Sequence, residues 1–236
     1  MKPFEGQLAV VTGASRGIGL AAATMLARGG AKVALLARGA TDLDVAARSI
    51  GGAAIPLSCD VADSSAVGQA IETIRRQGEP SVLVNNAGVF RLAPVERTTV
   101  EDFEATLETN LLAPFRLVRA FLPGMKARGR GHIITIGSIA DRAVFPENAA
   151  YAASKFGARA MHEVLRLELR GTGVRATLVS PGPVDTGLWN EVDPDNRPGF
   201  TPRRDMLAAD AVAAAVEFAL TRPADVNIDE LRLSRT

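Results

Sequence analysis

Tyr151 and Lys155 are the pair of side chains in this sequence whose types and spacing most clearly suggest chemistry. They form a Tyr-x-x-x-Lys pattern, and Tyr151 is the only tyrosine in the chain. Positions four apart lie on one face of a helix, so the phenol and the ammonium group are expected to point the same way. A neighbouring positive charge favours the phenolate, so we expect Lys155 to lower the pKa of Tyr151 from its usual value of about 10. Such a tyrosine can exchange a proton with an alcohol or a carbonyl group.

Ser138 and Asn110 are two further candidates. Ser138 ends an apolar, β-branched run upstream of Tyr151. Asn110 falls inside a predicted long helix, where asparagine has a poor propensity. Pro114, four residues later, cannot donate a hydrogen bond to the carbonyl of Asn110. The freed carbonyl could hold a water molecule, although an ordinary proline kink explains the pattern equally well.

A glycine-rich turn follows the first predicted strand and reads Thr-Gly-Ala-Ser-Arg-Gly-Ile-Gly at 12–19. Glycines there let the backbone turn tightly and approach a pyrophosphate, while the next helix offers free N–H groups to phosphates. The alternative is a purely structural turn. The residues expected to contact a dinucleotide are Gly13, Ser15, Arg16, Gly17, Ile18 and Gly19.

The end of the second predicted strand bears on the choice between NAD and NADP. An acidic residue there would bind the ribose 2′-hydroxyl of NAD, whereas an arginine can pair with the 2′-phosphate of NADP. This chain has Ala37 followed by Arg38, and Arg16 lies in the glycine turn. We therefore expect NADP, with NAD less favoured; the alternative is that Arg38 is a solvated loop charge.

Two loops after later strands are candidates for the adenosine half of the cofactor. Asn85 is followed by Asn86, Ala87 and Gly88, whose small and amide side chains could flank the cofactor. Asp60 and Val61 follow the third strand and could meet the adenine. Both segments could also be ordinary turns.

The elements that must position these residues alternate between short apolar strands and longer segments of helical period. The predicted strands are 8–12, 31–36, 53–58, 82–85, 133–137, 174–179 and 226–233. The predicted helices are 17–28, 41–50, 64–77, 100–128, 149–169 and 208–220. This pattern predicts an α/β fold, a Rossmann doubly wound parallel sheet of about seven strands with helices on both faces. We expect a single domain over 1–236, with a lid-like segment at about 186–205.

Composition narrows the class of protein. With 236 residues, 47% of them hydrophobic, and a formal net charge of +1, the chain can build one sizeable core and gives no sign of nucleic-acid binding. One cysteine, Cys59, excludes an internal disulfide and fits a reducing compartment. His132 and His162 share no ligand spacing with Cys59, so we expect no metal site. We expect a cytoplasmic protein without a signal peptide or membrane span.

Together these motifs resemble the short-chain dehydrogenase/reductase family over nearly the whole chain. The shared features are the glycine turn at 12–19, Asn-Asn-Ala-Gly at 85–88, Asn110, Ser138, Tyr151 with Lys155, and Pro181-Gly182. The final segment at 226–233 departs from the commonest pattern and is similar to a branch of NADP-dependent reductases acting on small hydroxy acids and alcohols.

The resemblance implies a role for each matching residue. Tyr151 would be the general acid in carbonyl reduction and the general base in alcohol oxidation. Lys155 would lower the pKa of Tyr151 and bind the nicotinamide ribose. Ser138 would hydrogen-bond the substrate oxygen, and Asn110 would hold the water of a proton relay. The residues implied at the nicotinamide end of the cofactor are Pro181, Gly182, Val184 and Thr186.

The implied activity is the NADP-dependent interconversion of a secondary alcohol and a ketone or aldehyde. A 3-oxoacyl thioester reductase of the fatty-acid type shares the mechanism and would need a basic entry for its acyl carrier. The arginines available for such an entry are Arg91, Arg97, Arg142, Arg203 and Arg204. A sugar-nucleotide epimerase would need a larger C-terminal domain, and an NADP(H)-binding redox sensor without turnover is the alternative from a different class. The expected partners are a small-molecule substrate and further copies of the chain, as a homodimer or homotetramer. Trp189 and Phe145 suggest an apolar wall to the substrate pocket, although either could equally cover the core.

Overall fold

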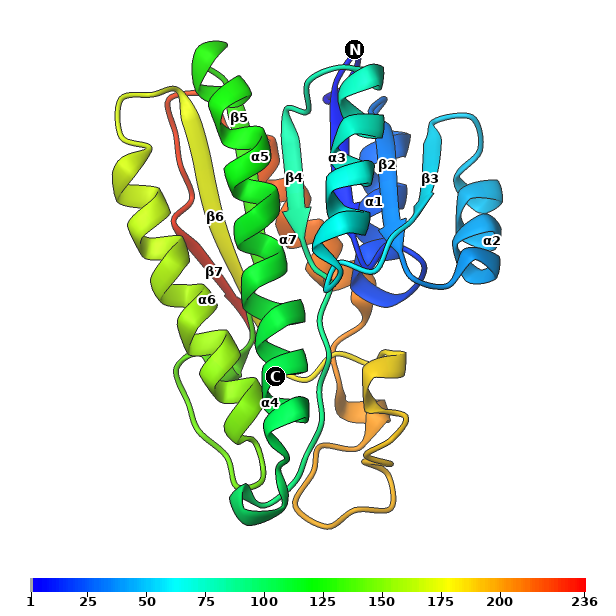
Figure 1. The fold of residues 1–236 in the computed structure, drawn as a ribbon, viewed down its shortest axis with the longest axis vertical. Helices are drawn as coiled ribbons and strands as arrows, with labels where there is room; N and C mark the ends of the chain where they lie inside the picture. The colour runs from blue at the N-terminus through cyan, green and yellow to red at the C-terminus, as the bar shows by residue number, and fades with distance from the viewer. Residues whose placement is uncertain (1) are drawn as a thin grey trace.

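The computed structural model describes residues 2–236, in which strands and helices alternate as predicted (Figure 1). The strands are β1 (Leu8–Thr12), β2 (Lys32–Ala37), β3 (Ala54–Ser58), β4 (Val82–Asn85), β5 (Gly131–Ile136), β6 (Val174–Pro181) and β7 (Glu230–Leu233). The α-helices are α1 (Gly17–Arg28), α2 (Ala40–Ile50), α3 (Ser64–Gln77), α4 (Val100–Leu107), α5 (Ala113–Ala127), α6 (Ala149–Glu168) and α7 (Ala209–Leu220).

The strands form one parallel, seven-stranded sheet in the order β3-β2-β1-β4-β5-β6-β7. The chain builds outward from β1 through β2 and β3, then returns to place β4 on the other side of β1. Ligands of such sheets bind beyond the carboxyl ends of the strands at this reversal. The predicted Rossmann-type fold is confirmed.

Both faces of the sheet are covered, and β1 shows why its sequence requires this. All five of its residues are buried. Successive strand residues point to opposite faces, so Val11 packs into the core beneath α1 and α7 while Val10 packs into the core beneath α3 and α5. In Figure 1, α3, α5 and α6 cross in front of the sheet and α1 and α7 lie behind it. A strand that is apolar at every position is stable only between two such layers.

The prediction of a single long α-helix over 100–128 is wrong in the middle of that range. A π-helical turn, η2 (Glu108–Leu112), separates α4 from α5, and buried Asn110 lies at its centre. Pro114 stands in the first turn of α5, where its missing N–H leaves no helical hydrogen bond unmade. The proline therefore accompanies a change of helix type rather than a simple kink.

The last strand is shorter than predicted, because β7 begins at Glu230 rather than at Val226. The side chain of Asn227 explains the difference. Its Oδ1 accepts a hydrogen bond from the Ala176 N–H at 3.0 Å, and its Nδ2 donates to the Ala176 carbonyl at 3.0 Å. A side-chain amide thus replaces the backbone ladder at the start of the predicted strand.

The segment 186–205 is irregular, as predicted, apart from two 3₁₀ turns, η4 (Gly187–Trp189) and η5 (Arg203–Asp205). Within residues 2–236, no helix combines the length and the hydropathy needed to cross a membrane.

Candidate active site

The turn between β1 and α1 is packed so closely that side chains cannot replace its glycines. Gly13 has φ of +63°, and a Cβ on Gly19 would lie 2.2 Å from the carbonyl oxygen of Gly13. Asn86, which follows β4, donates from Nδ2 to the Thr12 carbonyl at 2.8 Å. The Thr12 hydroxyl in turn accepts the backbone N–H groups of Asn86 and Ala87, each at 2.9 Å. These bonds fix the turn against the end of β4 and leave the N-terminus of α1 facing a cavity.

That cavity has a volume of about 640 Å³ and lies at the carboxyl ends of the strands. It brings together most of the residues that the sequence singled out. Those that line it are Gly13, Ser15, Arg16, Gly17, Ile18, Arg38, Asp60, Val61, Asn86, Ala87, Gly88, Ser138, Tyr151, Lys155, Pro181, Gly182, Val184 and Thr186. Gly19 and Asn110 lie outside the lining. Gly19 packs against the carbonyl of Gly13, and Asn110 is hydrogen-bonded to Val89, which lines the cavity.

The lining of the cavity fits a dinucleotide phosphate. Free N–H groups at the start of α1 and the tight glycine turn suit a pyrophosphate. Arg16 and Arg38 line the same end, and Ala37 occupies the position at which an acid would bind a ribose hydroxyl. Asp42 also lines this end and was not predicted.

Ser138 and Tyr151 meet at the other end of the cavity. Ser138 follows β5 and caps the 3₁₀ turn η3 (Ile139–Asp141), where its Oγ accepts the Ala140 N–H at 3.1 Å. The hydroxyl proton of Ser138 therefore remains free to be donated elsewhere. Tyr151 lies in the first turn of α6, and the Ser138 side chain lowers the pKa of its phenol.

The pKa of Tyr151 is shifted in the direction opposite to the one expected. Burial and, to a smaller extent, the charge of Asp141 raise the pKa of Tyr151 to about 12, against the lowering by the Ser138 hydrogen bond. Burial also lowers the pKa of Lys155 to about 8, against the opposing charge of Asp141. Its Nζ lies 5.6 Å from the Tyr151 ring centroid and donates to the Ile136 carbonyl at 2.9 Å. The spacing predicted the proximity of the two groups but not their desolvation.

Asn110 connects the loop after β4 to the helix that carries Tyr151. Its Oδ1 accepts the Val89 N–H at 2.9 Å, and its Nδ2 donates to the Val89 carbonyl and to Ser154 Oγ, each at 3.0 Å. The widened π-helical turn directs this side chain between the two segments. Its side chain is thus fully engaged in structural bonds, and the relay water at its carbonyl remains a prediction.

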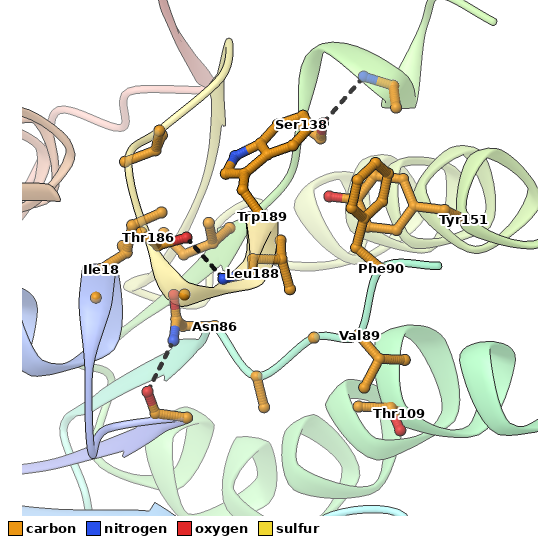
Figure 2. A pocket seen from close by; sticks show the side chains of 18 of the residues that line it. Ile18, Asn86, Val89, Phe90, Thr109, Ser138, Tyr151, Thr186, Leu188 and Trp189 are labelled. Carbon is orange, nitrogen blue, oxygen red and sulfur yellow. Dashed lines mark hydrogen bonds between the residues drawn. The ribbon is translucent and has the colours of Figure 1, made fainter. Parts of the chain in front are cut away.

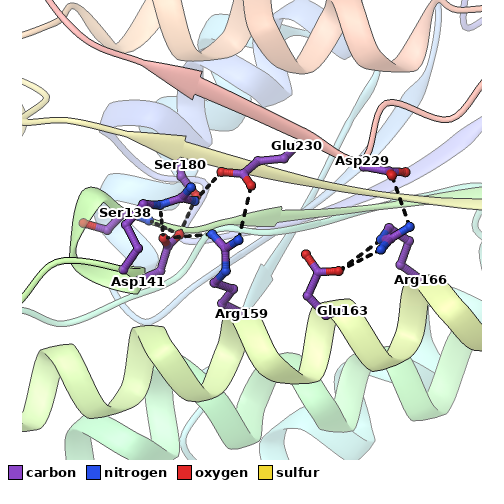
Figure 3. A network of polar contacts seen from close by, with 9 residues as sticks. Ser138, Asp141, Arg159, Glu163, Arg166, Ser180, Asp229 and Glu230 are labelled. Carbon is purple, nitrogen blue, oxygen red and sulfur yellow. Dashed lines mark hydrogen bonds and ion pairs between the residues drawn. The ribbon is translucent and has the colours of Figure 1, made fainter.

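Asp141 is a buried acid beside the catalytic candidates that sequence reasoning missed. Its carboxylate accepts the Ser138 N–H at 3.3 Å and the Ser180 hydroxyl. Arg142 donates to it at 2.8 Å, and Arg159 lies 3.6 Å away. Figure 3 shows these contacts, which join β5, β6 and α6. Ser180 and Arg159 are distant in the sequence, but the Ser138-x-x-Asp141 spacing is that of a capping box and was a local signal for this acid.

Aromatic side chains form a wall beside Tyr151. The Phe90 ring packs edge-to-face with Tyr151, with ring centroids 4.8 Å apart, and with Trp189, at 5.1 Å. Trp189 contacts Phe200 in the same way at 6.4 Å. Figure 2 shows Phe90 and Trp189 flanking the space in front of Ser138 and Tyr151. Trp189 and Phe145 line the cavity as predicted, while Phe90 and Phe200 were not foreseen.

Comparison with known proteins identifies the family. The sequence model described as short chain dehydrogenase matches residues 7–197. The chain belongs to the short-chain dehydrogenase family. This membership makes it an oxidoreductase that uses NAD or NADP, and it agrees with the glycine turn, Ser138 and the Tyr151–Lys155 pair at the cavity.

Similar curated proteins cover a range of substrates. The chain is 35% identical over 240 residues to D-threitol dehydrogenase of Mycolicibacterium smegmatis, covering 96% of this chain and 92% of that protein. It is 36% identical over 219 residues to the 3-oxoacyl-[acyl-carrier-protein] reductase of Escherichia coli, covering 91% and 90%. A 36% identity over 236 residues to glycine betaine reductase of Emericella nidulans covers 97% of this chain but spans only 19% of that longer protein.

Solved structures of short-chain dehydrogenases share the whole fold. A metagenomic short-chain oxidoreductase in complex with NADP superposes with a TM-score of 0.86 at 35% identity, covering 99% of both chains. The closed form of serine dehydrogenase complexed with NADP⁺ gives a TM-score of 0.87 at 30% identity, covering 96% of this chain and 94% of that one. A 3-ketoacyl-(acyl-carrier-protein) reductase from Brucella melitensis, complexed with NADH, gives 0.86 at 26% identity and 98% coverage of both.

Proposed function

We propose that this short-chain dehydrogenase uses NADP(H) to interconvert a secondary alcohol and a ketone or aldehyde, with Tyr151 as the general acid and base. One observation carries the proposal. Ser138, Tyr151 and Lys155 line the same cavity as the glycine turn and two arginines. A carbonyl group in front of Tyr151 would thus lie within reach of both a proton donor and the nicotinamide.

The protonation state of Tyr151 fits the general-acid role in the proposed reaction. When bound, the nicotinamide supplies a hydride to the carbonyl carbon or accepts one from the alcohol. With a pKa raised to about 12, the phenol of Tyr151 holds its proton at neutral pH and can give it to the carbonyl oxygen. The free hydroxyl proton of Ser138 orients that oxygen. For alcohol oxidation the phenol must first be deprotonated, which the buried site disfavours.

Arg38 and Arg16 support the preference for NADP over NAD. Both line the end of the cavity where Ala37 replaces an acid. Replacing Arg38 with Asp should turn the preference toward NADH, because a carboxylate accepts the ribose hydroxyl and repels a 2′-phosphate. The measurement is the ratio of kcat/KM for NADPH and NADH. An unchanged ratio would remove Arg38 from the argument.

A 3-oxoacyl thioester reductase is the second candidate, and the similarity to acyl-carrier reductases keeps it in the test. The arginines suggested for a basic entry are mostly engaged with acids. The pairs are Arg91 with Asp102, Arg142 with Glu230, Arg203 with Asp185 and Arg204 with Asp205. This pairing weakens the case for recognition of an acidic carrier.

NADPH oxidation against a panel of carbonyl compounds tests the function. The panel should hold small 3-oxo acids, aldehydes, aromatic ketones and a 3-oxoacyl thioester, with Tyr151→Phe run beside the wild type. We expect turnover with one class and a loss of about a hundredfold or more in the variant, the usual contribution of a general acid, with NADPH binding retained. Turnover retained by Tyr151→Phe would refute the mechanism, and NADPH binding without turnover of any compound would favour the redox sensor.

A further inference from the structure

The end of the cavity in front of Tyr151 has an unusual balance of charge. We define this substrate end by its lining residues within 89–92, 139–148 and 187–201. Among the described residues of these ranges that line the cavity, Glu147 is the only one with an ionisable side chain. Its carboxylate is paired with Arg197, and the guanidinium of Arg197 also lies 4.7 Å from the Phe200 ring centroid.

The cations of the cavity lie elsewhere. Arg38 lines the end beside the glycine turn, and Lys155 is buried with its Nζ bonded to the Ile136 carbonyl. Arg16 comes nearer, since its guanidinium lies 3.7 Å from the position that a Cβ on Gly187 would take. A substrate carboxylate placed among the aromatic side chains would lose its hydration without a charged partner in that wall, which is costly in an apolar site.

The aromatic wall shows what this end is built to contact. Phe90 joins Tyr151 to Trp189, and Trp189 joins Phe90 to Phe200 through edge-to-face contacts. Figure 2 shows Leu188 and Val89 beside this row. Such a surface gains free energy by covering apolar groups, and most by covering another ring.

We propose that the substrate is an uncharged ketone or secondary alcohol that carries an aromatic or cyclic hydrocarbon group next to the reacting carbon. This inference rests on the proposed function and narrows it. It predicts that this chain and serine dehydrogenase differ in substrate, because serine is a charged amino acid, although the two proteins share a fold. The Glu147–Arg197 pair engages the cation that lies against the Phe200 ring of the aromatic wall.

Two acetophenones that differ only in charge test the proposal. The para-carboxamide and the para-carboxylate have nearly the same size and the same reacting carbonyl. We expect kcat/KM with NADPH to be at least about tenfold higher for the carboxamide, since a tenfold ratio needs only a small difference in free energy. Equal values, or a preference for the carboxylate or for a small 3-oxo acid, would overturn the inference. If the enzyme reduces the carboxylate or the 3-oxo acids and Tyr151→Phe abolishes that reduction, the proposed function survives without the substrate inference. If it reduces no compound, both the proposed function and the substrate inference are refuted.

Glu147→Gln provides an internal check on the charge argument. The substitution keeps the shape of the side chain but releases Arg197. We expect the carboxylate-to-carboxamide ratio of kcat/KM to rise about tenfold, because Arg197 then has no competing carboxylate. In the double variant Glu147→Gln/Arg197→Gln the ratio should return to the wild-type value. A ratio that does not change in Glu147→Gln would show that Arg197 does not control the charge preference.

The Asp141 cluster carries a second, independent inference. Beyond Asp141, both Arg142 and Arg159 also reach Glu230 on β7; the Arg159–Glu230 distance is 3.5 Å. The Asp141 side chain is completely buried and holds the N–H of Ser138. Even the adjacent glycine is constrained, because a Cβ on Gly137 would lie 2.5 Å from Asp141 Oδ2. Glu230 of β7 is thus connected to the Ser138 turn by ion pairs, through Arg142 and Arg159 to Asp141.

We infer that Asp141 and Glu230 are positioning residues for Ser138. Asp141 fixes the backbone of the η3 turn, so that the Ser138 hydroxyl points at Tyr151. Glu230 holds the two arginines that pair with Asp141. Replacing Glu230 should therefore disturb the position of the Ser138 hydroxyl and leave the cofactor-binding residues unchanged.

The chain offers a matched control beside the same two elements. Asp229, the residue directly before β7, pairs with Arg166 of α6 at 3.1 Å, and this pair has no contact with Ser138 (Figure 3). We expect Glu230→Gln to lower kcat about tenfold and to leave the Kd for NADPH within about twofold, a split typical of a lost transition-state contact. Asp229→Asn should leave kcat unchanged. Equal kcat values for the two variants would overturn the inference, and Asp141→Asn should repeat the Glu230→Gln effect more strongly.

Discussion

At the scale of single residues, Tyr151 shows how strongly burial controls an ionisable group. Its position relative to Lys155 is the one predicted from a four-residue spacing. The direction of its pKa shift is not, because the spacing of two side chains contains no information about the solvent around them. The contacts of Asp141 also depend on tertiary structure, because its partners come from β6 and α6 as well as from the η3 turn. Sequence patterns therefore found the residues that share a motif and missed the one held by distant segments.

Because Tyr151 is the only tyrosine, its ionisation can be followed directly by the ultraviolet absorbance of tyrosinate. In the folded protein without cofactor we expect no tyrosinate at pH values where a free tyrosine, with a pKa of about 10, is half ionised. In urea the same protein should titrate near that ordinary value. Ser138→Ala should move the folded-state pKa still higher, because the Ser138 hydrogen bond lowers it.

Tyr151→Phe is the control for this titration and should give no signal in either state. Tyrosinate appearing in the folded protein below the pH at which the unfolded protein ionises would contradict the raised pKa.

At the scale of elements, the sequence predicted the strand–helix alternation and most boundaries within one or two residues. This succeeded because the strands are apolar at nearly every position and the helices are amphipathic, so that pattern and burial agree. The two errors both involve asparagine. Asn227 replaces backbone pairing with its side chain, and Asn110 occupies a π-helical turn whose role is to span two segments. In both cases a long-range side-chain bond overrode local preference.

Arg203 is the residue that most firmly anchors the segment 186–205. Its guanidinium donates to Asp185 at 2.6 Å, to Asn190 Oδ1 at 2.8 Å and to the Thr186 carbonyl at 3.1 Å, and its backbone N–H donates to Asp195 at 2.8 Å. We expect Arg203→Ala to raise the rate of limited proteolysis within this segment, since local opening exposes its backbone.

If the segment is a lid, Arg203→Ala should also raise the KM for NADPH severalfold, because Thr186 lines the cavity. Arg204→Ala is the control, since Arg204 is exposed and has only a 3.7 Å contact with Asp205. Cleavage at equal rates in the two variants would argue against an anchoring role for Arg203.

At the scale of the whole molecule, two buried histidines link stability to pH. Burial lowers the pKa of His132 from 6.5 to about 3 and that of His162 from 6.5 to about 4, for the latter despite the opposing charge of Glu163. Each is bonded to a threonine, His132 to Thr177 at 2.8 Å and His162 to Thr135 at 3.1 Å.

These shifts predict that stability falls as the pH drops below 6.5. Between pH 6.5 and 4 the unfolded chain binds protons at both histidines and the folded chain does not, so stability is complete above this window and declines within it. Each histidine contributes at most about 1.4 kcal/mol per pH unit. Urea unfolding across this range measures the slope.

His162→Gln should reduce that slope by up to about the contribution of one histidine, because the neutral amide binds no proton in the unfolded chain. An identical slope in the variant would show that His162 is not held neutral in the folded protein.

The place of Glu230 on the last strand has a consequence for the timing of synthesis. When the ribosome has released the chain through α7, every proposed catalytic and cofactor-binding side chain has already emerged, and the sheet from β3 to β6 can form with both faces covered. Arg142 and Arg159 still lack their shared acid until β7 follows. A nascent chain at that stage would hold its full set of reacting groups with the serine turn still unanchored. Activity would then begin with the arrival of the final strand, so that an interrupted polypeptide would bind dinucleotide but reduce little.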